Sequence, residues 1–158
     1  MPTVTLTEQN FDSVVTGNRI VLVDWWADWC GPCQHFAPIY ESSSEQHSDI
    51  VYGKVDVEAQ KSLTEAANVS QYPTLMAFRE GVLVYSEAGV LPGDALEDLI
   101  QQVIWLDMDQ VRRTMAEQAE AQRNGQEYQT PAPETVSAAP SVKAGLASAT
   151  ASYGWPGL

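Results

Sequence analysis

Cys30 and Cys33 are the only cysteines in this chain of 158 residues, and they stand three positions apart in the stretch Trp29-Cys30-Gly31-Pro32-Cys33. A disulfide across so short a loop hardly constrains the unfolded chain, so the pair is not placed to stabilise a fold. In a reducing compartment, a C-x-x-C pair indicates redox chemistry or half of a metal site. These two thiols are therefore the first candidates for chemistry.

A helix that begins at this pair would give the two thiols different roles. Residues three apart on a helical turn share a face, so the two sulfurs can meet. Cys30 would lie at the helix start, where unpaired N–H groups and the positive end of the dipole stabilise a thiolate. We expect Cys30 to attack a target disulfide, and the more covered Cys33 to resolve the mixed disulfide and leave a Cys30–Cys33 disulfide.

An acid, Asp24, stands in the apolar run 20–26 that precedes the cysteines. The run is rich in β-favouring residues and is typical of a central strand buried on both faces. Because side chains alternate along a strand, Asp24 shares a face with Leu22 and Trp26. The following helix passes back across the strand, which places Asp24 beneath Cys33.

Burial at that position would raise the pKa of Asp24, because the interior disfavours the charged carboxylate. A carboxyl group that titrates near neutrality can take the proton of Cys33 when this thiol must attack, so we expect Asp24 to be a general base that acts through a water. The structural alternative is a buried acid paired with Lys54.

The elements that must position these groups alternate along the first hundred residues. Thr7 is expected to cap the first helix, Pro38 to kink the second, and Glu80-Gly81 to form a hairpin turn. Strands are expected at 3–6, 20–26, 50–57, 74–79 and 83–88, and helices after Thr7, at about 33–47, at 61–68 and from 93. This order predicts an α/β fold whose sheet is covered by helices on both faces.

The character of the chain changes after Trp105. We expect one domain over 1–106, an additional helix over 107–124 that Asp107 caps, and a tail over 125–158. The tail is dominated by Ala, Ser, Pro, Thr, Gly and Gln without an apolar period, and it is expected to be disordered.

The formal net charge is −13, from 21 acidic and 8 basic residues, and such a surface repels nucleic acids and anionic membranes. No apolar run is long enough to span a bilayer, and the N-terminus lacks the features of a signal peptide. We therefore expect a cytoplasmic protein that binds neither nucleic acid nor membrane.

Residues 29–33 resemble the active-site motif of the thioredoxin family, and most of residues 3–105 are similar to its pattern. The other matching stretches are Val23–Asp28 before the motif, Ala37-Pro38, Lys54-Val55-Asp56, Tyr72-Pro73-Thr74, Phe78–Gly81 and Ala88-Gly89-Val90. The resemblance implies the thioredoxin fold, a central mixed β-sheet flanked by helices on both faces, here with a C-terminal extension. Trp25, Tyr72 and Gln34 depart from the family's common Phe, Ile and basic residue.

The resemblance also implies a function, protein-disulfide reduction, and a set of site residues. A cis peptide bond would precede Pro73, Lys54 would approach and tune Asp24, and a target segment would lie along the Pro73 loop through backbone hydrogen bonds. The wall of the implied groove is Trp29, Gly31, Pro32, Tyr72, Pro73 and Gly89. The resemblance implies a monomer whose targets are disulfide-containing proteins. Thioredoxin reductase, which uses NADPH and FAD, would recycle it, and the chain itself is expected to bind no cofactor.

Three alternatives stay open. The first is an oxidase or isomerase of the same fold, although Gly31-Pro32 resembles the reducing members. The second is a binding module whose cysteines are incidental. The third is a metal site built from Cys30, Cys33, His35 and His47, which lacks a second C-x-x-C pair.

Overall fold

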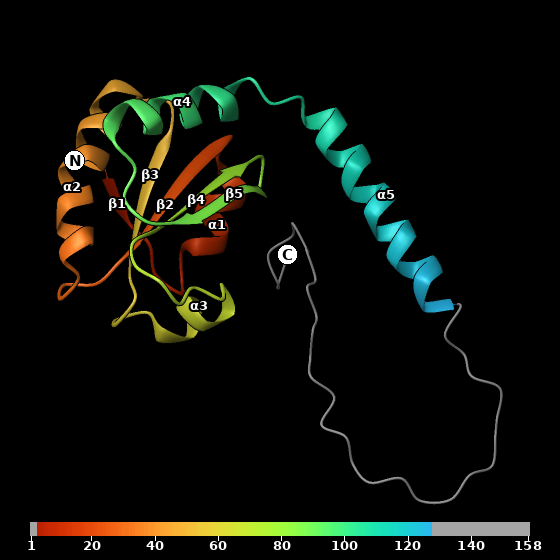
Figure 1. Ribbon diagram of the computed structural model, residues 1–158, viewed down its shortest axis with the longest axis horizontal. Helices are drawn as coiled ribbons and strands as arrows, with labels where there is room; N and C mark the ends of the chain where they lie inside the picture. The colour runs from red at the N-terminus through yellow and green to blue at the C-terminus, as the bar shows by residue number, and fades with distance from the viewer. Residues whose placement is uncertain (1–2, 128–158) are drawn as a thin grey trace, which may run out of the picture. The chain divides into compact units, whose positions relative to one another are not determined.

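A single five-stranded sheet forms the centre of the fold in the computed structural model, which describes residues 3–127 (Figure 1). Its strand order is β1-β3-β2-β4-β5. The strands are β1 (Thr3–Thr5), β2 (Ile20–Trp26), β3 (Val51–Asp56), β4 (Thr74–Arg79) and β5 (Val82–Ala88). Because β2 pairs in parallel with β3 and antiparallel with β4, the sheet is mixed, as the resemblance implied.

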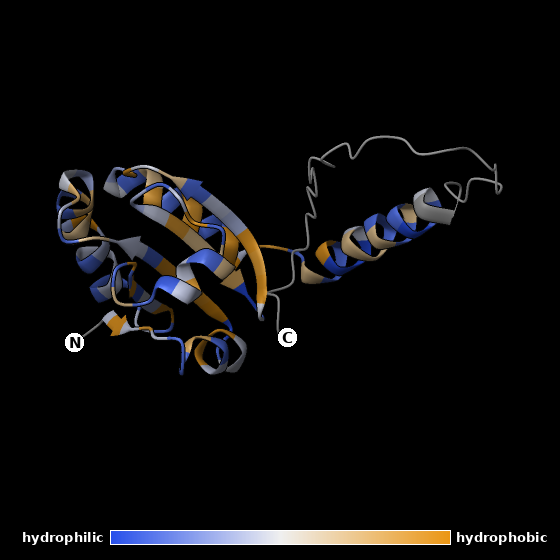
Figure 2. Ribbon diagram, turned by 90° about the horizontal axis from the view of Figure 1, so that it is seen from below, coloured by the Kyte–Doolittle hydropathy of each residue, from blue (hydrophilic) through white to orange (hydrophobic). Residues whose placement is uncertain are grey.

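Helices cover both faces of this sheet and enclose two apolar clusters. Helices α1 (Phe11–Gly17) and α3 (Lys61–Ala66) pack on one face, and α2 (Gly31–Gln46) and α4 (Gly93–Ile104) pack on the other. Figure 2 shows the hydrophobic residues of this domain concentrated on the strands between the helices. The expected α/β architecture is confirmed.

Strand β2 lies at the centre of the sheet and is buried on both faces. It lies between β3 and β4, and its residues from Ile20 to Trp25 are all buried. Alternate residues face the two clusters, so Val21 and Val23 join one and Leu22 joins the other. The expectation of a strand buried on both faces is confirmed, and Asp24 lies inside it.

The start of α1 differs from the expectation that Thr7 caps it. Asn10 occupies the N-cap position, and its side-chain oxygen reaches back to accept the N–H of Thr7 at 2.7 Å. The Thr7 carbonyl oxygen in turn accepts the N–H of Phe11 at 3.0 Å. The backbone of Thr7 therefore closes a turn ahead of the helix, and its hydroxyl group is not the cap.

The β4–β5 hairpin turns at Glu80 and Gly81, as predicted. Both residues have positive φ, 52° and 78°. A two-residue turn with positive φ at both positions matches the right-handed twist of the flanking strands.

Arg79, at the end of β4, fixes the end of α4. Its guanidinium group is buried and donates to the carbonyl oxygens of Val103, at 2.8 Å, and Ile104, at 3.2 Å. The last carbonyl groups of a helix have no partner within the helix, and a cation near them also interacts favourably with the dipole.

The chain divides into two units, and α5 (Met108–Glu127) belongs to the second. The carboxylate of Asp107 caps this helix, because it accepts the N–H groups of Asp109 at 3.0 Å and Gln110 at 3.2 Å. The helix continues three residues past the expected end at 124. The expected tail lies outside the described residues from 128 onward.

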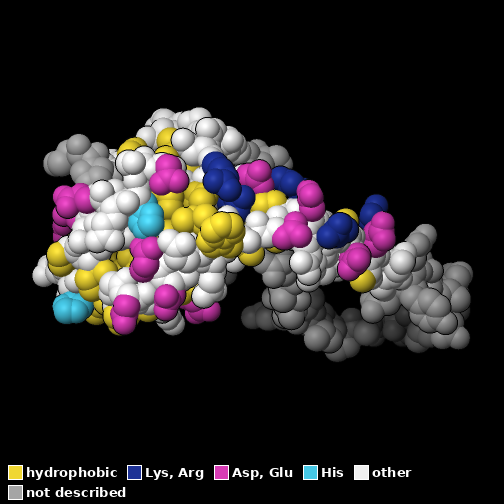
Figure 3. Space-filling view, turned by 90° about the horizontal axis from the view of Figure 1, so that it is seen from above, with side chains coloured by type: hydrophobic (Ala, Val, Ile, Leu, Met, Phe, Trp, Pro, Cys, Tyr) yellow, Lys and Arg dark blue, Asp and Glu magenta, His cyan; other side chains and the backbone are white. Residues whose placement is uncertain are grey.

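Acidic side chains are spread over the face shown in Figure 3 instead of gathering at one place. Within residues 3–127, no helix combines the length and the apolar character that crossing a membrane requires.

Gly53 leaves room for the Leu6 side chain, and we predict that Gly53→Ala destabilises the fold. An added Cβ would clash with Leu6 and lie 3.3 Å from the Leu22 carbonyl oxygen. We expect the free energy of unfolding to fall by about 1–3 kcal/mol, measured by urea denaturation. Gly17→Ala is the matched control, because nothing lies within 4 Å of its added Cβ. Equal effects of the two substitutions would contradict this prediction.

Candidate active site

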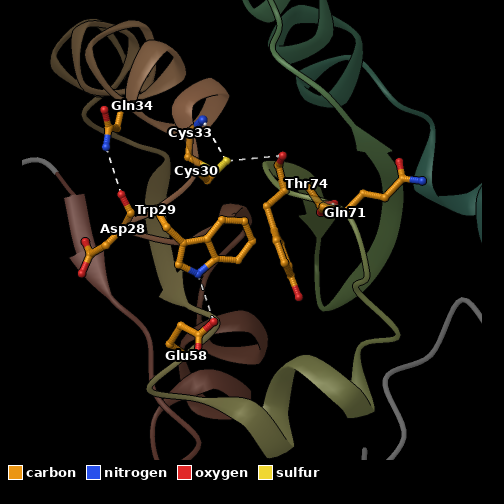
Figure 4. Close-up of a disulfide and its surroundings, with 9 residues drawn as sticks. Asp28, Trp29, Cys30, Cys33, Gln34, Glu58, Gln71 and Thr74 are labelled. Carbon is orange, nitrogen blue, oxygen red and sulfur yellow. Dashed lines mark hydrogen bonds between the residues drawn. A yellow bond between two sulfur atoms is a disulfide. The ribbon is translucent and has the colours of Figure 1, made fainter.

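The first turn of α2 holds both cysteines (Figure 4). Cys30 is the N-cap residue, with an extended backbone, and its sulfur accepts the N–H of Cys33 at 3.2 Å. The Cys30 carbonyl oxygen accepts the N–H of Gln34 at 3.2 Å. The helix therefore begins at Gly31, two residues before the expected start at Cys33, because the sulfur takes the role of a capping oxygen.

The two cysteines form a disulfide, and their Cα atoms lie 5.2 Å apart. Cys33 was expected to be the more covered of the two, and the difference is marginal, because Cys30 is 5% exposed and Cys33 is 4% exposed. Gly31 and Pro32, between them, are exposed. The surroundings of the two sulfurs, and not their exposure, must therefore distinguish their roles.

The Tyr72-Pro73 loop lies directly beside Cys30. The peptide bond between Tyr72 and Pro73 is cis, as expected, and the Tyr72 carbonyl oxygen lies 3.5 Å from the Cys30 sulfur. The N–H of Gly89 donates to the Pro73 carbonyl oxygen at 2.8 Å, and Gly89 has a φ of 111°, where a side chain would be strained. The Tyr72-Pro73 loop thus contacts Cys30 on one side and the Gly89 segment on the other.

Trp29 forms an exposed aromatic wall next to the disulfide. It is 66% exposed, and its ring meets the ring of Tyr72 edge to face, with centroids 5.8 Å apart. The indole N–H donates to the carboxylate of Glu58 at 3.1 Å, which fixes the ring (Figure 4). An Asp56 side-chain oxygen accepts the N–H of Glu58 at 2.9 Å and holds this segment in turn.

Sequence reasoning missed Glu58, although one signal could have found it. Strands β2 and β3 are parallel, and Trp26 is the register partner of Asp56. The segments that follow the two strands therefore leave the sheet at the same edge, and Trp29 and Glu58 come from these segments.

Asp24 lies buried opposite Lys54. The two residues are register partners on β2 and β3, and Asp24 is 1% exposed. Burial raises the pKa of Asp24 from 3.8 to about 7, and the positive charge of Lys54 opposes part of this rise. Neither carboxyl oxygen has a hydrogen-bond partner among the described residues, so the structural alternative, a buried acid paired with Lys54, is not seen as a hydrogen-bonded pair.

A cavity of about 160 Å³ joins Asp24 to the second cysteine. Cys33, Asp24 and Lys54 all line it, which agrees with the expectation that Asp24 lies beneath Cys33. The other lining residues are Trp26, Ala27, Asp28, Gln34 and Ala37. The cavity is roomy enough for water, whose share of liquid volume is about 30 Å³ per molecule.

The four donors of the metal alternative do not come together. Cys30 and His47 are the cap residues at opposite ends of α2, and the His47 ring lies 2.7 Å from the carboxylate of Glu97. His35 lies on an exposed position of the helix. Over residues 3–127, no three His, Cys, Asp or Glu side chains gather as they would to hold a metal ion.

Comparison with known proteins agrees with this geometry. The profile of the Thioredoxin family matches residues 2–102, which is more than half of the chain. A protein of Streptomyces coelicolor named "Putative thioredoxin 2" is 54% identical over 116 residues, which cover 73% of this chain and 87% of that protein. The thioredoxin of Alicyclobacillus acidocaldarius is 37% identical over 103 residues, 65% of this chain and 98% of its own length.

A solved structure shows the same fold. A mutant thioredoxin from Halobacterium salinarum matches with a TM-score of 0.62 and 37% identity, over 66% of this chain and 92% of that chain. The paired cysteines, the cis-proline loop and these similarities point to one conclusion. The chain belongs to the thioredoxin family and is a thiol–disulfide oxidoreductase.

Proposed function

We propose that this chain is a protein-disulfide reductase, which reduces disulfides of target proteins by dithiol–disulfide exchange. The observation that carries the proposal is the sulfur-capped start of α2, where the Cys33 N–H donates to the Cys30 sulfur beside the loop of the half-buried Tyr72 and the buried Pro73. In the proposed cycle, a thioredoxin reductase that uses NADPH and FAD returns the disulfide to the dithiol. The chain would act as a monomer in the cytoplasm.

Cys30 is the nucleophile of this cycle. Its position gives a thiolate the N–H of Cys33 and the positive end of α2 as stabilising partners. The thiolate attacks one sulfur of the target disulfide and forms a mixed disulfide, and the other target sulfur leaves as a thiolate.

Cys33 is the resolving thiol, and Asp24 is the general base that activates it. A carboxylate with a pKa of about 7 can accept a proton near neutral pH, and the shared cavity gives a water a path from Cys33 to Asp24. The Cys33 thiolate then attacks the Cys30 sulfur, which restores the Cys30–Cys33 disulfide and releases the reduced target. Lys54 tunes the proton affinity of Asp24 through its charge.

The target segment is proposed to bind in extended form along the Tyr72-Pro73 loop. The exposed residues Trp29, Gly31, Pro32 and Gly89 would form the rest of the wall, together with the half-buried Tyr72. Backbone hydrogen bonds would then supply affinity with little dependence on the target's sequence.

The most direct test is coupled turnover. Full-length protein with thioredoxin reductase and insulin should consume NADPH, and omission of the chain should stop this consumption. Equilibration with glutathione tests the oxidase or isomerase alternative. A strongly oxidising Cys30–Cys33 pair would overturn the assignment as a reductase. If a double variant Cys30→Ser, Cys33→Ser kept the cellular role, the binding-module alternative would replace it.

Cys33→Ser is predicted to accumulate the mixed disulfide with a target, because its serine cannot release Cys30. Cys30→Ser is the matched control and should form no such adduct under the same conditions, since the nucleophile is gone. Non-reducing electrophoresis with mass spectrometry measures the adduct. Equal trapping by both variants would contradict the assigned roles.

Asp24→Asn is predicted to slow the release of the target by ten-fold or more, as expected for the loss of a general base that contributes roughly 10²–10⁴. The attack by Cys30 should remain near its normal rate, because Asp24 borders the cavity of Cys33. Rapid-mixing kinetics separate the two steps. Unchanged breakdown of the mixed disulfide would remove Asp24 from the mechanism.

Asp24→Asn should also stabilise the oxidised protein in a pH-dependent way. The pKa of Asp24 is raised from 3.8 to about 7 in the folded chain. Between these two pH values, Asp24 is therefore protonated in the folded chain and ionised in the unfolded chain. The wild type therefore loses stability as the pH rises between these values, by roughly 4 kcal/mol in total. Urea denaturation should show the stabilising effect at pH 8 and little of it at pH 4. A gain that is independent of pH would contradict the assigned cause.

A further inference from the structure

Lys54 and Asp24 are placed to form an ion pair, yet they are not hydrogen-bonded to each other. They are register partners on adjacent strands, and both line the same cavity of about 160 Å³. Both carboxyl oxygens of Asp24 lack a hydrogen-bond partner among the described residues. The Lys54 ammonium group instead lies over the ring of Trp26, 5.3 Å from its centroid.

We propose that Trp26 is a positioning residue that holds the Lys54 ammonium group over its ring and thereby keeps it from pairing with Asp24. The face of an indole ring attracts a cation more strongly than the ring of any other side chain. Trp26 is suited to this competition because it stands two residues after Asp24 on the same strand and also lines the cavity. The inference rests on the proposed function of Asp24 as a base.

The consequence for the reaction follows from the strength of the base. An ammonium group hydrogen-bonded to Asp24 would stabilise the carboxylate and lower its pKa, and a weaker base would take the proton of Cys33 less readily. Held over the ring, Lys54 still contributes some positive charge, but it leaves both oxygens of Asp24 free to face water in the cavity.

Within the part of the chain that the structure describes, no other cation lines the cavity beside Asp24. Helix α2 presents Cys33 and Tyr40, and the Tyr40 hydroxyl donates to the Gly53 carbonyl oxygen at 2.8 Å. The loop after β2 presents Asp28, and the register partner of Asp24 on β4 is Leu75. Among the residues that line the cavity, Lys54 alone carries a positive charge.

The test is a double-mutant cycle read by NMR titration of the Asp24 carboxyl carbon in the oxidised, full-length protein. Trp26→Leu should release Lys54 and lower the titration midpoint of Asp24 by about one pH unit, as a close opposite charge does. In the Lys54→Met background, the same Trp26→Leu change should leave the midpoint nearly unchanged. In the single variant Trp26→Leu, the Lys54 methylene protons should lose the upfield ring-current shift that the indole ring causes.

The cycle separates the approach of the Lys54 charge to Asp24 from a mere increase in the exposure of Asp24 to water. A smaller side chain could admit water to Asp24 and lower the midpoint, but that effect would be equal with and without Lys54. An equal fall in both backgrounds, or no fall in the first, would overturn the inference. Trp26→Phe keeps an aromatic face that attracts a cation more weakly, so it should lower the titration midpoint of Asp24 by a smaller amount. This variant tests the inference if Trp26→Leu does not fold.

The titration does not depend on turnover, so its outcome is distinct from that of the proposed function. If Asp24→Asn left target release unchanged while the cycle behaved as described, the base role would fail and the positioning role of Trp26 would stand. If the cycle failed while Asp24→Asn slowed target release, Asp24 would remain the base and the inference about Trp26 would be wrong.

Discussion

The hydrogen bond from the Cys33 N–H to the Cys30 sulfur is the interaction on which the rest of the site depends. It places a sulfur where helices usually have an oxygen cap, so the reactive atom and the positive end of the helix coincide. It also fixes the start of α2 at Gly31, which sets Cys33 one turn into the helix and above the buried strand β2. The chemistry of the pair is thus a property of a helix terminus, and the sheet serves to hold that terminus in place.

The second constraint is the buried acid Asp24 in β2, whose ionisation lowers the stability of the fold. Asp24 is buried in the central strand of the sheet, and its oxygens have no hydrogen-bond partner among the described residues. A buried, unpaired carboxyl group is costly once it ionises. The same burial gives the group a pKa of about 7, which suits a base that works near neutral pH. In the proposed mechanism this acid is the general base, and the cavity beside it supplies the proton path from Cys33.

The parts of this site that the sequence predicted are those with a local cause. The C-x-x-C spacing, the apolar run around Asp24 and the Glu80-Gly81 turn each carry their own signal, and the resemblance to the family supplied the cis-proline loop and Gly89. The parts that were missed or wrong depend on contacts between distant segments. Glu58 reaches Trp29 across the edge of the sheet, and Arg79 caps a helix more than twenty residues away along the chain. The nearly equal burial of Cys30 and Cys33 likewise follows from how the loops meet, and no pattern within residues 29–33 indicates it.

Alkylation of the reduced protein as a function of pH shows whether the start of α2 ionises the Cys30 thiol. Iodoacetamide reacts with the thiolate, so peptide mapping after short exposures reports the ionisation of each sulfur separately. An ordinary thiol ionises at about pH 8.5. We expect Cys30 to reach its half-maximal rate of alkylation well below this pH, and Cys33 not to react in the same range. Reaction of Cys30 only at the pH of an ordinary thiol, or equal reaction of both cysteines, would contradict this expectation.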